Sequence, residues 1–242
     1  MDNVLSVKRQ VKSCDTDRFR RMRLSVLFRI LQELSIAHTE ALGAGRAKTL
    51  DKGALWVMGK MKVEMSRPIF YDEKILLESW PGKTVHFIFP RYYQFINEDG
   101  ELLCNASGIW ALIDQETRRV VMPEELGISL PEEKRDNELS LPMTVKVQET
   151  AKTYERKVTY SDIDLNGHVN NTCYLDWFED LFPMEYHKSH YWKRVQIHFI
   201  KEIYPNQKVE MKVGNQGDTW YMEGFADGET VFRLSADSER ID

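Results

Sequence analysis

Two stretches of the chain decide its fold: residues 14–33, CDTDRFRRMRLSVLFRILQE, and residues 161–180, SDIDLNGHVNNTCYLDWFED. At an offset of 147 residues, the aspartates at positions 15 and 17 align with those at positions 162 and 164. Behind each aspartate pair runs an apolar pattern with helical spacing. Its members are Leu24, Leu27, Phe28 and Leu31 in the first stretch and Tyr174, Leu175, Trp177 and Phe178 in the second. The two stretches therefore indicate an internal repeat.

Two further pairs of segments repeat in the same order. IFYDEKILLE (69–78) matches IYPNQKVEMK (203–212), and EDGELL (98–103) matches ADGETV (226–231). The second pair carries Asp-Gly, which favours a tight hairpin turn between strands. Three matches in one order predict that the chain contains two copies of one structural unit.

Each copy is predicted to run from a strand into a helix and then into several strands. Alternation at 55–65 and 195–199, together with abundant Val, Ile, Tyr and Phe, favours strands. A single helix followed by an antiparallel sheet must bury its apolar stripe against that sheet. We therefore predict an α+β fold of two tandem hotdog units, each a curved antiparallel sheet wrapped around a central helix. The two units are expected to pair edge to edge, like a covalent version of a two-fold dimer.

The division of the chain follows from composition. Residues 123–150 contain three prolines and many charges, so they are interpreted as a linker between a first half (1–122) and a second half (151–242). The first half is longer between its helix and its next strand, at ALGAGRAKTLDKGA (41–54). That extra length could cover or line a cavity.

Overall composition excludes several classes of protein. The 33 basic and 38 acidic side chains give a formal charge of −5, which makes no general case for nucleic-acid binding. The three cysteines are far apart and lack metal or redox spacing, which indicates a reducing compartment. No segment approaches the ~20 apolar residues of a membrane span, and the N-terminus lacks a signal-peptide pattern. We expect a soluble, cytoplasmic protein without a cofactor or a metal.

The second half carries the run DIDLNGHVNN (162–171), whose polar residues suit chemistry. In the aligned first half, Phe19 stands at the position of Asn166 and Arg21 at the position of His168. Because polar residues of catalytic type occur in one copy alone, the repeat predicts a single working site in the second half.

The expected position of this run explains its chemistry. If it enters a helix directly, then Asp164, Asn166 and His168 lie at the helix N-terminus, where free backbone N–H groups can polarise an acyl carbonyl. Gly167 allows close approach of a substrate, and His168 titrates near neutral pH. Aspartate at a helix start is also a common cap, and Asn-Gly is a common turn, so a purely structural interpretation stays open.

The run resembles the signature of the acyl-acyl-carrier-protein thioesterase family, in a bacterial-type member. The residues that carry the signature are Asp164, Asn166, His168, Val169, Asn170, Asn171, Tyr174 and Trp177. The resemblance continues through segments 55–73, 78–83, 107–119 and 201–210 and so covers nearly the whole chain. It implies a double hotdog with its working residues in the second half and much of the acyl pocket in the first.

The resemblance also implies roles for individual residues. Asp164, Asn166 and His168 are expected to be catalytic, and Glu202 fits the family's downstream acidic residue, on a strand that faces the helix start. Plant members carry a cysteine directly after that glutamate, whereas this chain has Ile203. We therefore expect direct hydrolysis by water that Glu202 and His168 activate, although Glu202 is equally compatible with an exposed glutamate of a strand.

Contacts to the substrate are predicted from the same run and from the apolar stripes. Gly167, Val169 and Asn170 are expected to bind the acyl substrate, together with Trp56 and Leu27. Apolar stripes are more often plain core than ligand contacts, so the last two stay open.

The predicted reaction is hydrolysis of a fatty acyl group from acyl-carrier protein. Two basic clusters, at positions 18–23 and 118–119, could steer the acidic carrier toward the site. Hydrolysis of coenzyme A esters and non-catalytic acyl binding are the alternatives, and a homodimer is compatible with the sequence. No Gly-x-Ser-x-Gly sequence occurs, which argues against a serine hydrolase.

Overall fold

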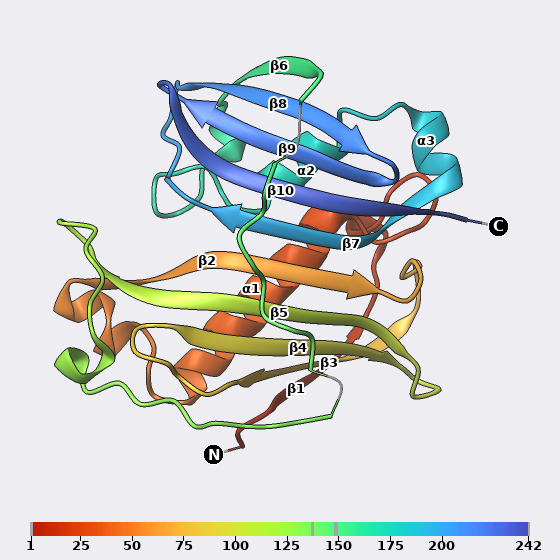
Figure 1. Ribbon diagram of the computed structural model, residues 1–242. Coiled ribbons are helices and arrows are strands. Elements are labelled where there is room, and N and C mark those ends of the chain that lie inside the picture. The colour runs from red at the N-terminus through yellow and green to blue at the C-terminus, as the bar shows by residue number, and fades with distance from the viewer. Residues whose placement is uncertain (1, 137, 148–149, 242) are drawn as a thin grey trace.

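The computed structural model describes residues 2–136, 138–147 and 150–241. Within these ranges, one ten-stranded antiparallel sheet has the order β1-β3-β4-β5-β2-β7-β10-β9-β8-β6 (Figure 1). The first unit contributes β1 (Leu5–Gln10), β2 (Ala54–Met65), β3 (Lys74–Pro81), β4 (Phe89–Asn97) and β5 (Leu102–Asp114). The second contributes β6 (Lys152–Lys157), β7 (His190–Phe199), β8 (Lys208–Gln216), β9 (Thr219–Ala226) and β10 (Glu229–Arg240).

The strand order of the second unit mirrors that of the first. The units meet where β2 pairs with β7, with Lys60 opposite His198 and Glu64 opposite Arg194. At the centre of this joint Val63 faces Val195, and both side chains are fully buried. The predicted fold class, two hotdog units in tandem, is confirmed, and the units pair edge to edge.

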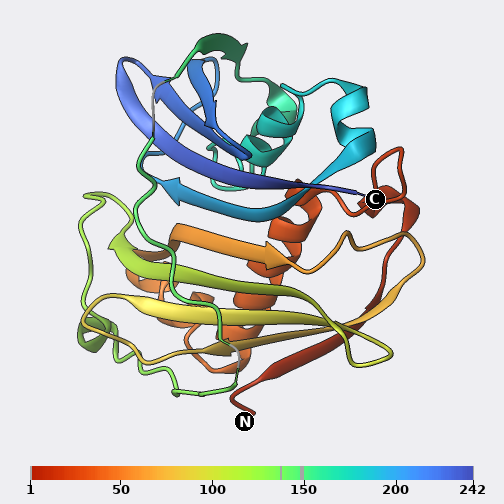
Figure 2. The ribbon, with the colours of Figure 1, turned by 45° about the vertical axis from the view of Figure 1, so that its right-hand side comes forward.

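A long helix, α1 (Leu24–Ala41), lies across the inner face of the first unit (Figure 2). Its predicted apolar stripe is buried: Leu24, Leu27, Phe28 and Leu31 are each at most 2% exposed. Burying this stripe removes a large apolar area from water, which stabilises the unit around the helix.

The second unit has two short helices in place of one long helix. They are α2 (Cys173–Glu179) and α3 (Met184–Ser189), with Pro183 at the start of α3. Proline lacks a backbone N–H and disfavours helical continuation from the residue before it, so the segment breaks there. The predicted stripe of α2, from Tyr174 to Phe178, is nevertheless buried.

The repeated Asp-Gly pairs form the predicted hairpin turns. Gly100 joins β4 to β5 with φ of 83°, and Gly228 joins β9 to β10 with φ of 78°. Glycine has no Cβ, so it adopts this left-handed conformation at little steric cost.

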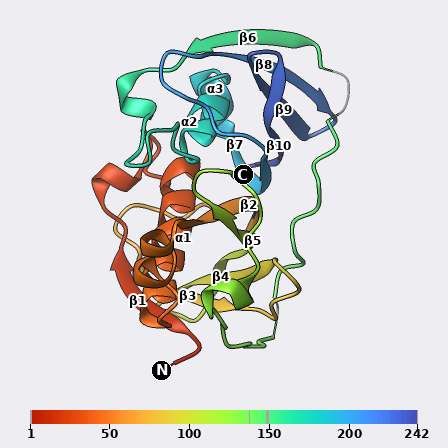
Figure 3. The same cartoon turned by 90° about the vertical axis from the view of Figure 1, so that its left-hand side faces the viewer.

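The segment between the units crosses the outer face of the sheet, opposite the helices (Figure 3). After a 3₁₀ turn at Pro123–Leu126, its described residues form no further helix or strand before β6. Ser107 of β5 donates to the Ser140 carbonyl, and Gln196 of β7 donates to the Met143 carbonyl. The segment therefore touches both units, while the domain boundaries drawn at 123–150 stay a prediction.

Candidate functional site

A cavity of about 720 Å³ lies between the two units. The first unit supplies α1, β2 and β5 as walls, and the second supplies the loops around residues 164–171, 199–207 and 226–231. Figure 3 faces the end of the molecule where β2 begins and β5 ends, which is the end that lines the cavity. The volume is in the range of pockets that bind small ligands.

The run at 164–168 forms a tight loop closed by its own backbone. The Asp164 N–H donates to the His168 carbonyl at 2.9 Å, and the Gly167 N–H donates to the Asp164 carbonyl at 3.0 Å. The Asp164 carboxylate accepts from the Asn166 N–H at 2.8 Å, and Gly167 has φ of 83°. Val169 donates to the Ile203 carbonyl at 2.8 Å, which ties this loop to the segment that carries Glu202.

The predicted position of this loop at a helix N-terminus is wrong. Helix α2 begins only at Cys173, because Ile163 and Val169 pair across the loop and hold it as a hairpin before the helix starts. Asn170 then turns the chain toward the helix, and its side-chain oxygen accepts from the Thr172 N–H at 2.9 Å and hydroxyl at 2.7 Å. Asn170 therefore has a structural position, and its neighbour Asn171 lines the cavity.

Glu202 was predicted to lie on a strand, and this is wrong. It lies in the loop between β7 and β8. The ladder of β7 with β10 ends at Phe199, and the N–H groups of Ile200 and Lys201 both donate to the Val231 carbonyl. The carboxylate of Glu202 nevertheless reaches the predicted partner: its Oε2 lies 3.5 Å from His168 Nε2.

The Glu202 carboxylate has two further partners. Its Oε2 accepts from the Tyr204 hydroxyl at 3.0 Å, and its Oε1 forms an ion pair with Arg118 Nη2. Arg118 belongs to the first unit, just after β5, so the two units share this cluster.

His168 is half-buried, with the ring edge-on to Tyr204 at a centroid distance of 5.2 Å. Burial lowers the pKa of His168 below its ordinary value; Arg118 lowers it further and Asp164 opposes the shift. The neutral imidazole is therefore the form present at neutral pH, and it can accept a proton.

The predicted substrate contacts divide into two groups. Trp56 lines the cavity, with its indole N–H bonded to the Ala44 carbonyl at 2.9 Å, and Val169 lines it as well, beside the predicted catalytic residues Asp164, Asn166 and Glu202. Gly167, Asn170 and Leu27 are not among the lining residues, and neither is His168, which was predicted to be catalytic. Leu27 is 1% exposed, since it lies on the stripe of α1 that faces the sheet, and the same helix presents Gln32 and Ile36 to the cavity.

The lining residues include several polar side chains that the sequence did not assign to the site, among them Arg118, Tyr204 and Gln32. Tyr204 is two residues from Glu202, so proximity in the chain could have suggested it. The Oε1 atom of Gln32 is buried without a hydrogen-bond partner. Arg118 meets Glu202 only through the pairing of the two units, which leaves no local signal in the sequence.

The first unit repeats the geometry of this loop, but Phe19 and Arg21 stand at the positions of Asn166 and His168. The Asp17 N–H donates to the Arg21 carbonyl at 2.8 Å, and the Arg20 N–H donates to the Asp17 carbonyl at 3.1 Å. Arg20 has φ of 65° at the position of Gly167, and Met22 donates to the Ile69 carbonyl as Val169 does to that of Ile203. The tight loop is therefore a feature of the repeated unit and does not by itself indicate catalysis.

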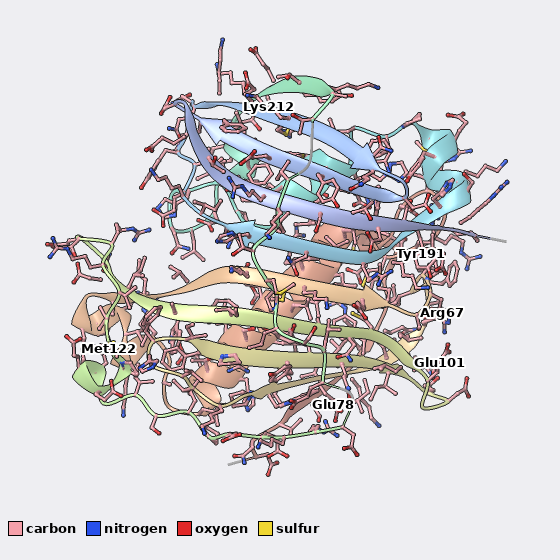
Figure 4. All side chains as sticks on the ribbon, viewed as in Figure 1. Arg67, Glu78, Glu101, Met122, Tyr191 and Lys212 are labelled. Atoms are coloured by element: carbon pink, nitrogen blue, oxygen red, sulfur yellow. The ribbon has the colours of Figure 1, made fainter. Side chains whose placement is uncertain are left out.

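The first-unit copy of the site is closed. A hollow of about 40 Å³ remains there, lined by Asp17, Arg21 and Pro68 among others. Arg21 is 7% exposed and donates to the His190 carbonyl at 3.0 Å and to the His187 carbonyl. Tyr191, which also lines this hollow, lies in Figure 4 at the end of the sheet opposite Met122. Because the guanidinium of Arg21 is buried against the His187 and His190 carbonyls, Arg21 is excluded as a carrier-docking residue.

Cys173 does not take the place of the cysteine that plant members carry at the position of Ile203. Cys173 has its pKa raised to about 11 by burial and by Asp162 and Asp176, so its nucleophilic thiolate is disfavoured. Ile203 is fully buried. Within the described ranges, no group of His, Cys, Asp and Glu side chains could hold a metal ion, and no helix is long and apolar enough to cross a bilayer.

Comparison with known families gives matches along most of the chain. The acyl-ACP thioesterase N-terminal domain matches residues 2–127, and the acyl-ACP thioesterase C-terminal domain matches residues 145–232. Among curated relatives, oleoyl-acyl carrier protein thioesterase 2 of Arabidopsis thaliana is 25% identical over 81% of this chain. Palmitoyl-acyl carrier protein thioesterase of Cuphea hookeriana is 27% identical over 72% of it. The chain spans 62% and 46% of the length of these two relatives.

Solved structures match the whole fold. The crystal structure of an acyl-ACP thioesterase from Bacteroides thetaiotaomicron has a TM-score of 0.89 at 23% identity, covering 98% of both chains. The 12:0-ACP thioesterase from Umbellularia californica has a TM-score of 0.85 at 17% identity, covering 100% of this chain and 99% of that one. At these identities the likeness supports the double-hotdog fold alone.

Proposed function

Since the chain belongs to the acyl-ACP thioesterase family, we propose that it hydrolyses fatty acyl-acyl-carrier protein to free fatty acid and carrier protein. One observation carries the proposal: Glu202 and Asn166, from two loops of the second unit, line a cavity that the first unit completes, and Glu202 lies 3.5 Å from His168. The closed copy in the first unit retains the loop but none of these three side chains.

Each residue of the cluster has a role in the proposed reaction. Glu202 takes a proton from water, and the water oxygen attacks the carbonyl carbon of the thioester. Asn166 donates from its side chain to the carbonyl oxygen as negative charge develops there. The carbon–sulfur bond then breaks, and the proton passes through His168, 3.5 Å from Glu202, to the departing sulfur. Asp164 holds the loop that presents Asn166 and His168.

The acyl chain is proposed to occupy the cavity between the units. Trp56, Met58 and Trp110 line it from the first unit, and Phe199 and Val231 line it from the second. These apolar walls match an apolar chain, while the polar cluster gathers the groups needed at the thioester.

Carrier docking is proposed on the cavity side of the molecule. The loop that carries the exposed residues Arg18 and Arg20 lies beside α3 in Figure 2, at the opposite end of the sheet. Arg119 is exposed and follows Arg118 near the cavity, so it is the better candidate to attract an acidic carrier. A homodimer and a cytoplasmic location stay predictions from the sequence.

The test is release of free fatty acid from a panel of acyl-acyl-carrier proteins and matching acyl-coenzyme A esters. We expect the carrier-protein substrates to be preferred, and His168→Ala to lose on the order of a hundredfold or more in kcat/KM. Equal or better use of coenzyme A esters would instead support a coenzyme A thioesterase. Tight acyl binding without hydrolysis by folded wild-type protein would support a non-catalytic binding protein.

A further inference from the structure

The Glu202 carboxylate is surrounded by His168, Tyr204 and Arg118. Among the residues that the structure describes, Arg118 is the one of these partners that comes from the first unit. Its backbone is held in place by Asp114 at the end of β5. The Asp114 side chain accepts from the N–H of Thr117 at 2.7 Å and from its hydroxyl at 2.8 Å, and the Asp114 carbonyl accepts from the Arg118 N–H at 3.0 Å. Arg118 itself has φ of 58°, so the turn directs it back toward the second unit.

We propose that Arg118 is a positioning residue for thioester hydrolysis, which fixes Glu202 beside His168 so that the first unit completes the hydrolytic centre of the second. This inference rests on the function proposed above. It adds a role for a residue that lies outside the DIDLNGHVNN run and in the other half of the chain.

The position of Glu202 explains why such a residue is needed. A glutamate in a loop has several free side-chain torsions, and no ladder of strand hydrogen bonds holds its backbone. Arg118 engages Oε1, which leaves Oε2 for Tyr204 at 3.0 Å and for His168 at 3.5 Å. A guanidinium is planar and permanently charged, so it fixes the plane of a carboxylate better than an ammonium does.

The other charged groups around the cavity do not substitute for Arg118. Lys201 is the second basic residue among the lining residues, and it pairs with Glu229. Asp227 accepts from the Gln207 side chain. Asp164 is the acidic neighbour that acts on His168 from its own loop, and it opposes the effect of Arg118 on the pKa of His168. Arg118 is thus the cation placed to compensate Glu202.

The test uses three variants of the full chain: Arg118→Gln, Arg118→Lys and Arg240→Gln. Arg240 is exposed at the end of β10, opposite His190, and does not line the cavity. Arg118→Gln should lower kcat by about tenfold or more, with KM changed by less than about threefold, because positioning is lost after the substrate has bound. Arg118→Lys, which keeps the charge but not the planar fork, should restore part of kcat. The control Arg240→Gln, the same change at an arginine away from the cavity, should leave kcat within about twofold of wild type.

A second readout requires no substrate. Titration of the His168 ring by NMR should show a higher pKa in Arg118→Gln than in wild type, because a positive charge near the imidazole has been removed. Arg118→Lys and Arg240→Gln should titrate close to wild type. A change in folding alone would not separate these variants in this way.

The two readouts distinguish failure of this inference from failure of the proposed function. If wild-type protein hydrolyses acyl thioesters and Arg118→Gln retains its kcat, the positioning role is overturned while the function stands. If folded wild-type protein hydrolyses no thioester, the proposed function is overturned together with the role of Arg118 in hydrolysis. An unchanged pKa of His168 in Arg118→Gln would also contradict the placement of Arg118 beside Glu202 and His168.

Discussion

At the scale of single residues, the internal repeat predicts which side chains matter and tertiary contacts decide how they are held. Comparing the two copies singles out Asn166 and His168, because Phe19 and Arg21 replace them in the other copy. The contact of Glu202 with His168 was expected from the resemblance, and the structure places them 3.5 Å apart. Arg118 could not be assigned to Glu202 from the sequence, since the contact forms only when the units pair.

The pKa of His168 leads to a prediction about pH. Burial and Arg118 hold this pKa below the ordinary 6.5, so the ring is neutral above that value and becomes protonated only as the pH falls further. If neutral His168 relays the proton, kcat/KM should be flat from neutral pH down to about 6.5 and should then fall on acidification.

A pH profile of kcat/KM, measured where the protein stays folded, checks this prediction. The residual activity of His168→Ala should lack the acidic decline assigned to the imidazole. A wild-type profile whose activity rises as His168 becomes protonated would contradict the proposed role.

At the scale of elements, repetition predicts strands and turns well, and it predicts where a helix or strand ends less well. The Asp-Gly hairpins and the buried stripes of α1 and α2 are confirmed. The second helix is split at Pro183, and Glu202 lies beyond the end of β7. Both differences depend on where hydrogen bonding stops, and neighbouring strands and loops decide that more than periodicity does.

The tight loop offers a stability prediction because its two copies differ at one strained position. Arg20 has φ of 65° where Gly167 has φ of 83°. A non-glycine residue in this region costs about 1 kcal/mol, so Arg20→Gly should raise the free energy of unfolding by up to about 1 kcal/mol. Gly167→Ala should lower it by about the same amount.

Urea unfolding of the two variants beside wild type measures both changes. The first-unit substitution should leave hydrolysis unaffected, because its copy of the site is closed by Arg21. Destabilisation by Arg20→Gly would show that the side chain of Arg20 contributes more than its backbone strain costs.

At the scale of the whole molecule, the two units form one structure through their shared edge. The β2–β7 ladder continues the sheet, and residues 139–145 pack across its outer face, with Leu139 and Val145 buried. The cavity takes walls from both units. We therefore expect the units to unfold together.

Thermal unfolding followed by far-UV circular dichroism and by tryptophan fluorescence should give one coincident transition. Val195→Ala removes two methyl groups opposite Val63, and it should lower the stability of the whole chain by about 2 kcal/mol while keeping a single transition. Two separate transitions, with only one moved by the substitution, would mean that the units are independent.

The central claim is that one hydrolytic site operates, in the second unit, at a loop that both units build in the same way. The most direct measurement compares kcat/KM for acyl-acyl-carrier protein in two matched variants, Asn166→Ala and Phe19→Ala, which alter aligned positions of the two loops. We predict a loss on the order of a hundredfold for Asn166→Ala and less than about threefold for Phe19→Ala. Equal losses in both variants, or wild-type activity in Asn166→Ala, would contradict the account.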